Sequence, residues 1–339
     1  MGSRSPSISI VIINYNGLVF LSECIRSLTS IGYPPDEMEI IVVDNASTDG
    51  STGCLEREFP RVTVLARDRN YGFARASNIG ARHARGEYLV FLNNDTVVMS
   101  GWLEELVRVM EADRDVGIAG SKLLLMDSPG KINSAGGIIT FTGGGYDFGF
   151  MDDDGEGYNV SGSRGYICAA SMIVRREEFL TFGGFDVDYF MYFEDVDLCW
   201  RYWLCGKDVA YVPASVVYHK FGGTANSSRH SSLRVFYGTR NSLLNMTKNY
   251  GARTLLFAFP LTLLYHLLKT LYFVASLRGG AALAMIKAHS SFVRLLPGAL
   301  DKRRAIQKLR RIGDRVLFDR CLIDPLSSTL REFLRLLRT

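Results

Sequence analysis

Apolar runs of strand length alternate with helical patterns through the first hundred residues. Runs of β-branched or other apolar residues, each bounded by turn residues, predict strands at 8–13, 39–43, 62–66 and 87–92. Helical spacing of apolar positions predicts helices at 18–30, 51–58, 75–85 and 102–112. This alternation predicts an α/β fold, with a Rossmann-like, mostly parallel central sheet flanked by helices.

The pattern is less regular beyond residue 112. Residues 128–165 are rich in Gly, Ser and Asp and predict loops around a hairpin. Further elements are expected at 166–174, 194–205, 209–212 and 231–250. We therefore expect an α/β domain over 1–228, with halves of about 1–100 and 101–228, followed by a helical C-terminal region over 229–339.

The C-terminal region contains an apolar stretch, residues 255–277, that is long enough to span a membrane. Its polar members recur at helical spacing and predict one wet face along an amphipathic helix. They are Thr262, His266, Lys269, Thr270 and Ser276. A central lysine in lipid would cost on the order of 3 kcal/mol, which argues against a true span.

Seven basic residues follow this stretch between Lys302 and Arg315. An amphipathic helix followed by a basic segment is typical of proteins that bind an anionic membrane surface. We therefore expect peripheral, interfacial association with the cytoplasmic face of the cell membrane. A true span and a helical subdomain packed on the core remain open.

Composition and charge exclude several classes of protein. Of 339 residues 47% are hydrophobic and 22% charged, which is typical of a globular chain. The net charge of +4 is too small to indicate nucleic acid, and the basic segment lacks interleaved aromatic residues. Six scattered cysteines without a CxxC pair predict reduced thiols, and the first residues lack the pattern of a secretory signal.

Polar residues follow three predicted strands at the point where each strand ends. In a parallel sheet these ends share one edge, where ligands bind. Asp44 is placed to accept hydrogen bonds from a ribose or a base, although a helix cap by Ser47 or Thr48 would also explain this turn. The other strand-end residues are Asn14, Tyr15, Asn16, Asn45, Asn93, Asn94 and Asp95.

Two further candidates concern a metal ion and a base. Asp95 is placed to hold Mg²⁺ or Mn²⁺, which prefer oxygen ligands, and the alternative is a simple turn. Glu194, Asp195 and Asp197 begin a predicted helix among apolar neighbours. Acidic residues are common at such positions because of the helix dipole, but a half-buried carboxylate also has a raised pKa and can act as a base. His219, 24 residues beyond Asp195, is either structural or a metal ligand.

Taken together and in order, these clusters resemble glycosyltransferase family 2, especially its bacterial rhamnosyltransferase-like branch. The matching segments are 9–16, 43–51, 69–74, 92–95 and 194–198, and the resemblance covers roughly residues 7–245. It implies a GT-A fold and an inverting, metal-dependent hexosyl transfer. The implied donor is dTDP-rhamnose or a UDP-sugar, and the implied acceptor is a polysaccharide of the cell envelope or a lipid-linked glycan.

The resemblance also implies roles for single residues. Asp195, in the pair with Glu194, corresponds to the catalytic base, Asp95 to a metal ligand, and His219 to a second metal ligand that some members supply. The implied donor-binding residues are Asn14, Asn16, Asp44, Asn70, Gly72, Asn78, Asn93 and Asn94. A late pair, Arg240-Asn241, is expected to contact phosphate or acceptor. Asn93 departs from the pattern, since many members have Asp there, and this leaves one carboxylate for the metal.

Two other functions stay open at this point. A sugar-nucleotide nucleotidyltransferase also uses an α/β domain and a metal, but residues 12–17 lack its Gly-rich phosphate loop and lysine. A non-catalytic scaffold that binds nucleotide-sugar is a second alternative, against which the presence of both Asp95 and Asp195 argues.

Overall fold

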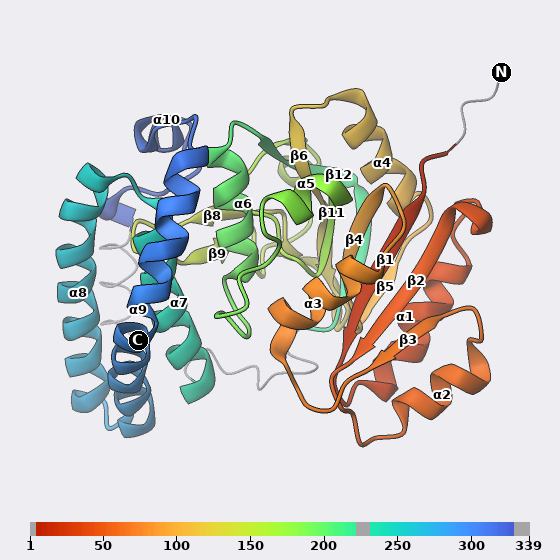
Figure 1. The fold of residues 1–339 in the computed structure, drawn as a ribbon, viewed down its shortest axis with the longest axis horizontal. Coiled ribbons are helices and arrows are strands. Elements are labelled where there is room, and N and C mark those ends of the chain that lie inside the picture. Colours follow the sequence, from red (N-terminus) through yellow and green to blue (C-terminus); the bar gives the residue numbers. More distant parts are fainter. Residues whose placement is uncertain (1–4, 222–230, 329–339) are drawn as a thin grey trace.

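The computed structural model describes residues 5–221 and 231–328, and one large mixed sheet lies at its centre (Figure 1). The strand order is β10-β12-β6-β11-β4-β1-β2-β3, with β5 paired to β12 and β7 to β6. These strands are β1 (Ile8–Asn14), β2 (Met38–Asp44), β3 (Thr63–Ala66), β4 (Tyr88–Asn93), β5 (Thr96–Val98), β6 (Val116–Leu125), β7 (Ser128–Ser134), β10 (Gly162–Ser163), β11 (Ser171–Arg175) and β12 (Asp208–His219). A separate hairpin pairs β8 (Gly137–Ile139) with β9 (Gly145–Asp147).

Helices cover both faces of the sheet and form a separate layer at the C-terminal end (Figure 1). Those beside the sheet are α1 (Leu18–Thr29), α2 (Ser51–Glu58), α3 (Gly72–His83), α4 (Trp102–Ala112), α5 (Arg176–Thr181) and α6 (Glu194–Leu204). The C-terminal layer contains α7 (Ser232–Asn249), α8 (Ala252–Ala275), α9 (Gly279–Leu309) and α10 (Asp314–Asp319). Two 3₁₀ turns lie at Pro35–Glu37 and Glu156–Tyr158.

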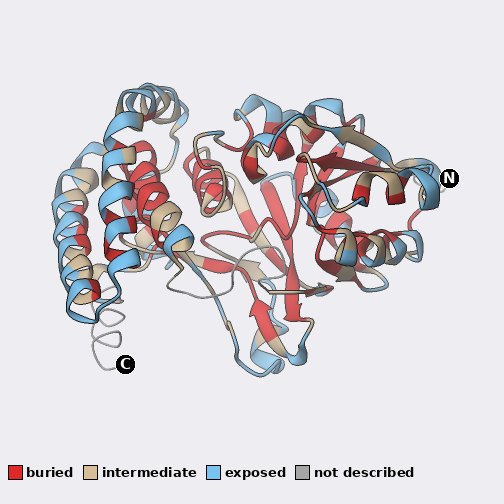
Figure 2. Ribbon diagram, turned by 90° about the horizontal axis from the view of Figure 1, so that it is seen from below, coloured by how far each residue is buried: buried red, intermediate tan, exposed pale blue. Residues whose placement is uncertain are grey.

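Strands β1 to β4 pair in parallel, as predicted. Strand β1 pairs in parallel with β2 on one side and β4 on the other, so that Asn14 lies opposite Asp44 and Ile13 opposite Asn93. Successive residues of β1 point to opposite faces: Ile10 and Ile12 pack toward α1 and α4, and Val11 toward α3 and α5. The central strands are therefore buried on both faces (Figure 2).

Most predicted elements are confirmed, and the differences have physical reasons. Helices α2 and α4 have the predicted bounds. Helix α3 begins at residue 72, earlier than the predicted 75, because Asn70 Oδ1 accepts a hydrogen bond from the N–H of Gly72 at 2.8 Å. The predicted strand 209–212 is too short, since β12 continues to His219 along β6 through an irregularity between Val212 and Val216. The predicted domain boundary at residue 228 lies outside the described residues.

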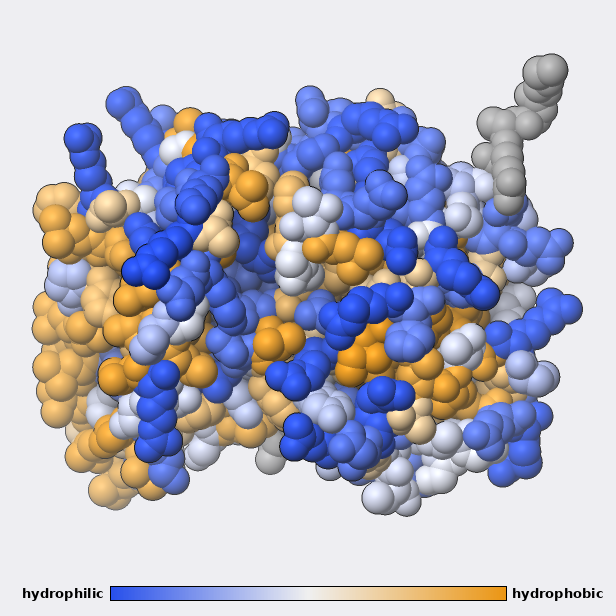
Figure 3. All heavy atoms as spheres, viewed as in Figure 1, coloured by the Kyte–Doolittle hydropathy of each residue, from blue (hydrophilic) through white to orange (hydrophobic). Residues whose placement is uncertain are grey.

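The polar stripe predicted along α8 is buried at Thr262 and His266 and exposed only at Ser276, so the prediction of one wet face was wrong for most of the helix. Thr262 is fully buried and His266 is 5% exposed, because the stripe faces α9. His266 Nδ1 lies 3.3 Å from Nε2 of His289 on α9, and burial lowers the pKa of His266 to about 3. The outward face of α8 is therefore apolar, and it forms the hydrophobic left edge of the molecule (Figure 3).

Candidate active site at the sheet edge

The ends of β1, β2 and β4 meet in one hydrogen-bonded cluster. Asn14 is fully buried, and its Nδ2 lies 2.8 Å from Asp44 Oδ1 and 2.9 Å from Ser51 Oγ. Asn94 Nδ2 donates to Asn14 Oδ1 at 2.9 Å. Three residues from three strand ends are thus joined as predicted, because parallel strands with this register end at one edge.

The carboxylate of Asp44 is fixed in place but keeps capacity to accept hydrogen bonds. Its Oδ1 accepts from Asn14, and its Oδ2 accepts from the N–H of Ser47 at 2.9 Å. Each carboxylate oxygen has a second lone pair, so Asp44 is still able to accept a ribose hydroxyl or a base N–H. The neighbouring turn is held by Asn16, whose Oδ1 accepts from the N–H of Thr48 at 2.8 Å.

The start of α3 lies beside this cluster. Asn45 Nδ2 donates to the carbonyl of Gly72 at 3.3 Å, which joins the end of β2 to the segment that contains Asn70. A surface hollow of about 320 Å³ opens next to it, lined by Arg67, Tyr71, Arg75, Ile79, Arg82 and Val187. Asn78 has a different environment: Nδ2 donates to the carbonyl of Phe185 and Oδ1 accepts from its N–H. These contacts are structural and leave the expected nucleotide contact of Asn78 without support.

Asp95 and His219 lie together although 124 residues separate them. Asp95 directly precedes β5, which pairs with β12 so that His219 lies opposite Thr96, and His219 Nε2 is 3.3 Å from Asp95 Oδ1. His219 Nδ1 lies 2.6 Å from Oδ1 of Asn133. His219 Nε2 also lies 3.3 Å from Nδ2 of Asn93, so this ring nitrogen faces the Asn93-Asn94-Asp95 segment while the contact of Nδ1 with Asn133 fixes the ring, as an outer oxygen does for a metal-binding histidine.

This pair fits a divalent cation that takes its other ligands from substrate and water. A carboxylate oxygen and an imidazole nitrogen are ligands that such a cation would accept, and these two atoms lie 3.3 Å apart. Among the described residues, no group of three or more His, Cys, Asp or Glu side chains is arranged to hold a metal. Such a sparse protein site is typical of cations that bridge the phosphates of a bound nucleotide.

Glu194 and Asp195 begin α6 and lie beside the turn that contains Ala169. Asp195 Oδ2 accepts from the N–H of Ala169 at 3.3 Å, and the next residue, Ala170, accepts from the N–H of Asn93 at 3.1 Å. A single turn thus connects the candidate base to the Asn93-Asn94-Asp95 segment. Burial raises the pKa of Asp195 to about 6, with nearby Asp147 adding to the effect.

Glu194 is buried more deeply than its neighbour. Burial, followed by the charge of Asp195, raises its pKa well above the usual value. Its Oε2 has no hydrogen-bond partner among the described residues. Burial opposes the charged form of Glu194, whereas Asp195 accepts backbone hydrogen bonds from Ala169 and Val196, so Asp195 is the better candidate for the base.

Asn133, Asp147 and Tyr166 are site residues that the sequence analysis missed. Asn133 orients His219, and Tyr166 donates its hydroxyl to Asp147 Oδ1 at 3.1 Å. Burial raises the pKa of Asp147. All but Tyr166 lie in the 128–165 segment, whose Gly-rich composition indicated loops but gave no sign of which side chains return to the site.

Comparison with known proteins finds similar glycosyltransferases. The model of the family described as glycosyl transferase family 2 matches residues 9–172. The O-antigen biosynthesis protein RfbC of Myxococcus xanthus is 32% identical over 60% of this chain and 16% of its own length. The N-acetylglucosaminyl-diphospho-decaprenol L-rhamnosyltransferase of Mycobacterium tuberculosis is 25% identical over 69% of this chain and 84% of its own.

A similar solved structure supports the fold of this chain. The mannosyltransferase PcManGT from Pyrobaculum calidifontis, in complex with GDP-Man and Mn²⁺, superposes with a TM-score of 0.53 and 17% identity, over 91% of this chain and 86% of its own. The chain spans about a quarter or less of the length of two of the curated relatives that it matches. The chain has the GT-A-like fold, and its residues 9–172 match glycosyl transferase family 2.

Proposed function

We propose that this chain is an inverting, metal-assisted glycosyltransferase with Asp195 as its base. The observation that carries the proposal is the convergence of three groups from distant parts of the sequence at one edge of the sheet. Asp44 provides acceptors for a nucleoside, Asp95 with His219 provides a cation site, and Asp195 provides a carboxylate of raised pKa. These are the groups that transfer from a nucleotide-diphosphate sugar requires.

The proposed step is a single displacement. The acceptor hydroxyl oxygen forms a bond to the anomeric carbon while the bond from that carbon to the diphosphate oxygen breaks. The hydroxyl proton passes to Asp195, and the electron pair of the breaking bond leaves with the diphosphate. Asp95 and His219 would hold a divalent cation, which would supply positive charge to stabilise the leaving diphosphate. Asn14 and Ser47 keep Asp44 oriented toward the nucleoside.

The donor and acceptor are proposed by likeness to relatives. A rhamnosyltransferase and an O-antigen biosynthesis protein among the relatives support dTDP-rhamnose as the first donor to test, with UDP-sugars next. The same names support an envelope polysaccharide or a lipid-linked glycan as acceptor. The Mn²⁺ bound in the mannosyltransferase complex supports Mn²⁺ or Mg²⁺ as the cation.

The pH dependence of transfer tests the proposed base. Because the pKa of Asp195 is raised to about 6, its carboxylate form disappears as the pH falls below that value. We expect kcat/KM to be level above about pH 7 and to fall about tenfold per pH unit well below pH 6. The measurement is transfer by the full chain between about pH 5 and 8 at saturating metal. A flat profile over this range contradicts a base with this pKa.

We further propose that the outward face of α8 rests on an anionic membrane. Among the described helices, α8 is the one that is long and apolar enough to cross a membrane, by length and composition. Much of its apolar surface is exposed, with Leu256 at 71%, Phe257 at 70% and Leu267 at 56%. Apolar side chains gathered on one face of a helix indicate an interaction surface, because soluble proteins rarely expose a patch of this kind.

Charge favours a lipid surface as the occupant. Residues 252–300, which contain α8 and most of α9, have no acidic residue. They have five basic ones, namely Arg253, Lys269, Arg278, Lys287 and Arg294. By contrast, the basic segment that follows is largely used inside the fold: Lys302 pairs with Asp186, and Arg310 with Asp314. The membrane contact is therefore assigned to residues 252–300, in α8 and α9, and not to the 302–315 segment.

Vesicle flotation tests this surface. We expect the full chain to float with vesicles of phosphatidylcholine and phosphatidylglycerol, and much less with phosphatidylcholine alone. The double variant Leu267→Glu/Leu271→Glu should abolish flotation, whereas Val160→Glu, which changes an exposed valine in a loop, should not. Absence of flotation for the unaltered chain contradicts the proposal. Concentration-dependent dimers that the double variant abolishes would instead identify a second copy as the occupant.

A further inference from the structure

The segment that leads into the candidate base, residues 186–193, has an unusual backbone. Phe190, Tyr192 and Phe193 have φ of 60°, 66° and 66°, in the left-handed region that residues other than glycine rarely adopt. Such a conformation is unfavourable for these residues and persists only where the surrounding structure imposes it. We call this segment the base loop, because Glu194 and Asp195 follow it directly.

Two adjacent side chains of α7 hold the middle of the base loop. Asn241 is fully buried and directs Nδ2 at the carbonyl oxygens of Tyr189, Met191 and Tyr192, at 3.2, 2.9 and 2.7 Å. Arg240 Nε donates to Asn241 Oδ1 at 2.9 Å, which fixes the orientation of the amide. Arg240 Nη2 also donates to the carbonyls of Asp188 and Tyr189 at 2.6 and 2.9 Å.

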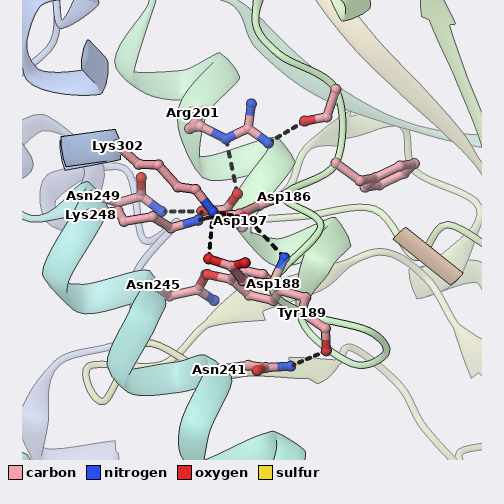
Figure 4. A network of polar contacts seen from close by, with 12 residues as sticks. Asp186, Asp188, Tyr189, Asp197, Arg201, Asn241, Asn245, Lys248, Asn249 and Lys302 are labelled. Atoms are coloured by element: carbon pink, nitrogen blue, oxygen red, sulfur yellow. Dashed lines mark hydrogen bonds and ion pairs between the residues drawn. The ribbon is translucent and has the colours of Figure 1, made fainter. Parts of the chain in front are cut away.

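Ion pairs hold the beginning of the same loop (Figure 4). Lys248 of α7, which is 1% exposed, lies 2.7 Å from Asp186 and 2.8 Å from Asp197. Lys302 of α9 lies 2.5 Å from Asp186 and 2.6 Å from Asp188. The C-terminal helices thus contact the base loop through buried bonds from Asn241 and Lys248 and through partly exposed ion pairs from Lys302.

The base loop also contacts the donor side of the site. The carbonyl of Phe190 accepts from the N–H of Phe73 at 2.7 Å. Gly72 has φ of +77°, and a Cβ there would lie 2.5 Å from the carbonyl oxygen of Phe190. The loop therefore lies between the Asn70–Phe73 segment and the pair Glu194-Asp195, so its conformation sets the position of the base relative to the donor.

We infer that Arg240 and Asn241 are positioning residues that hold the base loop, and with it Asp195, in the geometry needed for transfer. This inference rests on the proposed function for its catalytic part. It replaces the expected contact of this pair with phosphate or acceptor, because the donors of Asn241 are directed at backbone carbonyls inside the protein. It also makes the C-terminal helices part of the active site as well as a candidate membrane contact.

The test compares Asn241→Leu with Thr247→Val in the full chain. Both changes remove a buried hydrogen bond from α7, but Thr247 Oγ1 donates within the helix, to the carbonyl of Leu243, and does not contact the loop. We expect Asn241→Leu to lower kcat by about 10²-fold, as misplacement of a catalytic group does, with a smaller change in donor KM. Thr247→Val should keep kcat within about twofold, at matched fractions of folded protein.

Amide hydrogen exchange provides a second readout that does not depend on catalysis. Exchange in peptides covering 186–195 should become roughly tenfold faster in Asn241→Leu and stay unchanged in Thr247→Val. If Asn241→Leu does not fold, Arg240→Lys keeps the charge, loses the bond that orients Asn241, and should change both readouts in the same direction. Unchanged exchange and unchanged kcat in the α7 variants overturn the inference. An unaltered chain without transfer activity would overturn the proposed function, whereas the exchange comparison would still decide the role of Asn241.

Discussion

Replacing Asp195 by asparagine should lower sugar transfer by at least about 10²-fold while donor binding persists. The amide keeps the shape of the side chain and is still able to accept the hydrogen bond from the N–H of Ala169. The amide has no basic oxygen, so no carboxylate takes the proton from the substrate hydroxyl as the new bond forms. Because Asp44, Asp95 and His219 are unchanged, the nucleotide and the metal should bind as before.

The matched control is Asp314→Asn, the same change at a buried carboxylate of α10 that pairs with Arg310. It should retain transfer at temperatures where the protein is folded. Steady-state kinetics with a labelled donor, together with nucleotide titration of each variant, separate turnover from binding. Near-normal turnover in Asp195→Asn would contradict the assignment of the base, and loss of nucleotide binding would indicate a donor-site role for Asp195.

Replacing Asp95 by asparagine should remove most of the metal-dependent stabilisation by nucleotide and lower transfer by about 10²-fold or more. Asn93 already provides an amide where many family members have Asp, so Asp95 is the sole carboxylate of its triplet. Without it, His219 would hold the cation with neutral amides, and Mg²⁺ and Mn²⁺ prefer charged oxygen ligands. Thermal unfolding with nucleotide and metal, compared with nucleotide and EDTA, isolates the metal-dependent part.

The control for this variant is Asp127→Asn, a nearby exposed carboxylate that pairs with Lys220, the neighbour of His219. It should keep the full metal-dependent shift. An equal loss in both variants would mean that the general negative potential of this edge matters, and not a ligand bond from Asp95.

The donor edge could be predicted from the sequence because its residues follow parallel strands directly. Asn14, Asp44 and Asn94 meet where the register of β1, β2 and β4 brings the strand ends together. The proximity of His219 to Asp95 depends on the pairing of β5 with β12, which no local pattern indicated. Asn133 and Asp147 were missed for the same reason, since a Gly-rich segment of irregular structure carries no periodicity that places its side chains.

The C-terminal helices show a different limit. The spacing of Thr262 and His266 correctly placed them on one face of a helix but did not determine what that face contacts. It packs against His289 and Met285 of α9, so the polar face is inside and the leucine face outside. The role of Arg240-Asn241 was equally hidden, because both residues act on the backbone of a loop about 50 residues away in the sequence.

The most direct test of the central claim is the thermal stability of the full chain with UDP, dTDP, GDP or CMP, each with Mn²⁺, Mg²⁺ or EDTA. A nucleotide at about 100 times its Kd stabilises a protein by about 2.7 kcal/mol, which shifts the melting temperature measurably. We predict a shift with one nucleotide diphosphate, dTDP first, that depends on the metal. No shift with any nucleotide in any metal would contradict the donor site at this sheet edge, and with it the proposed transferase.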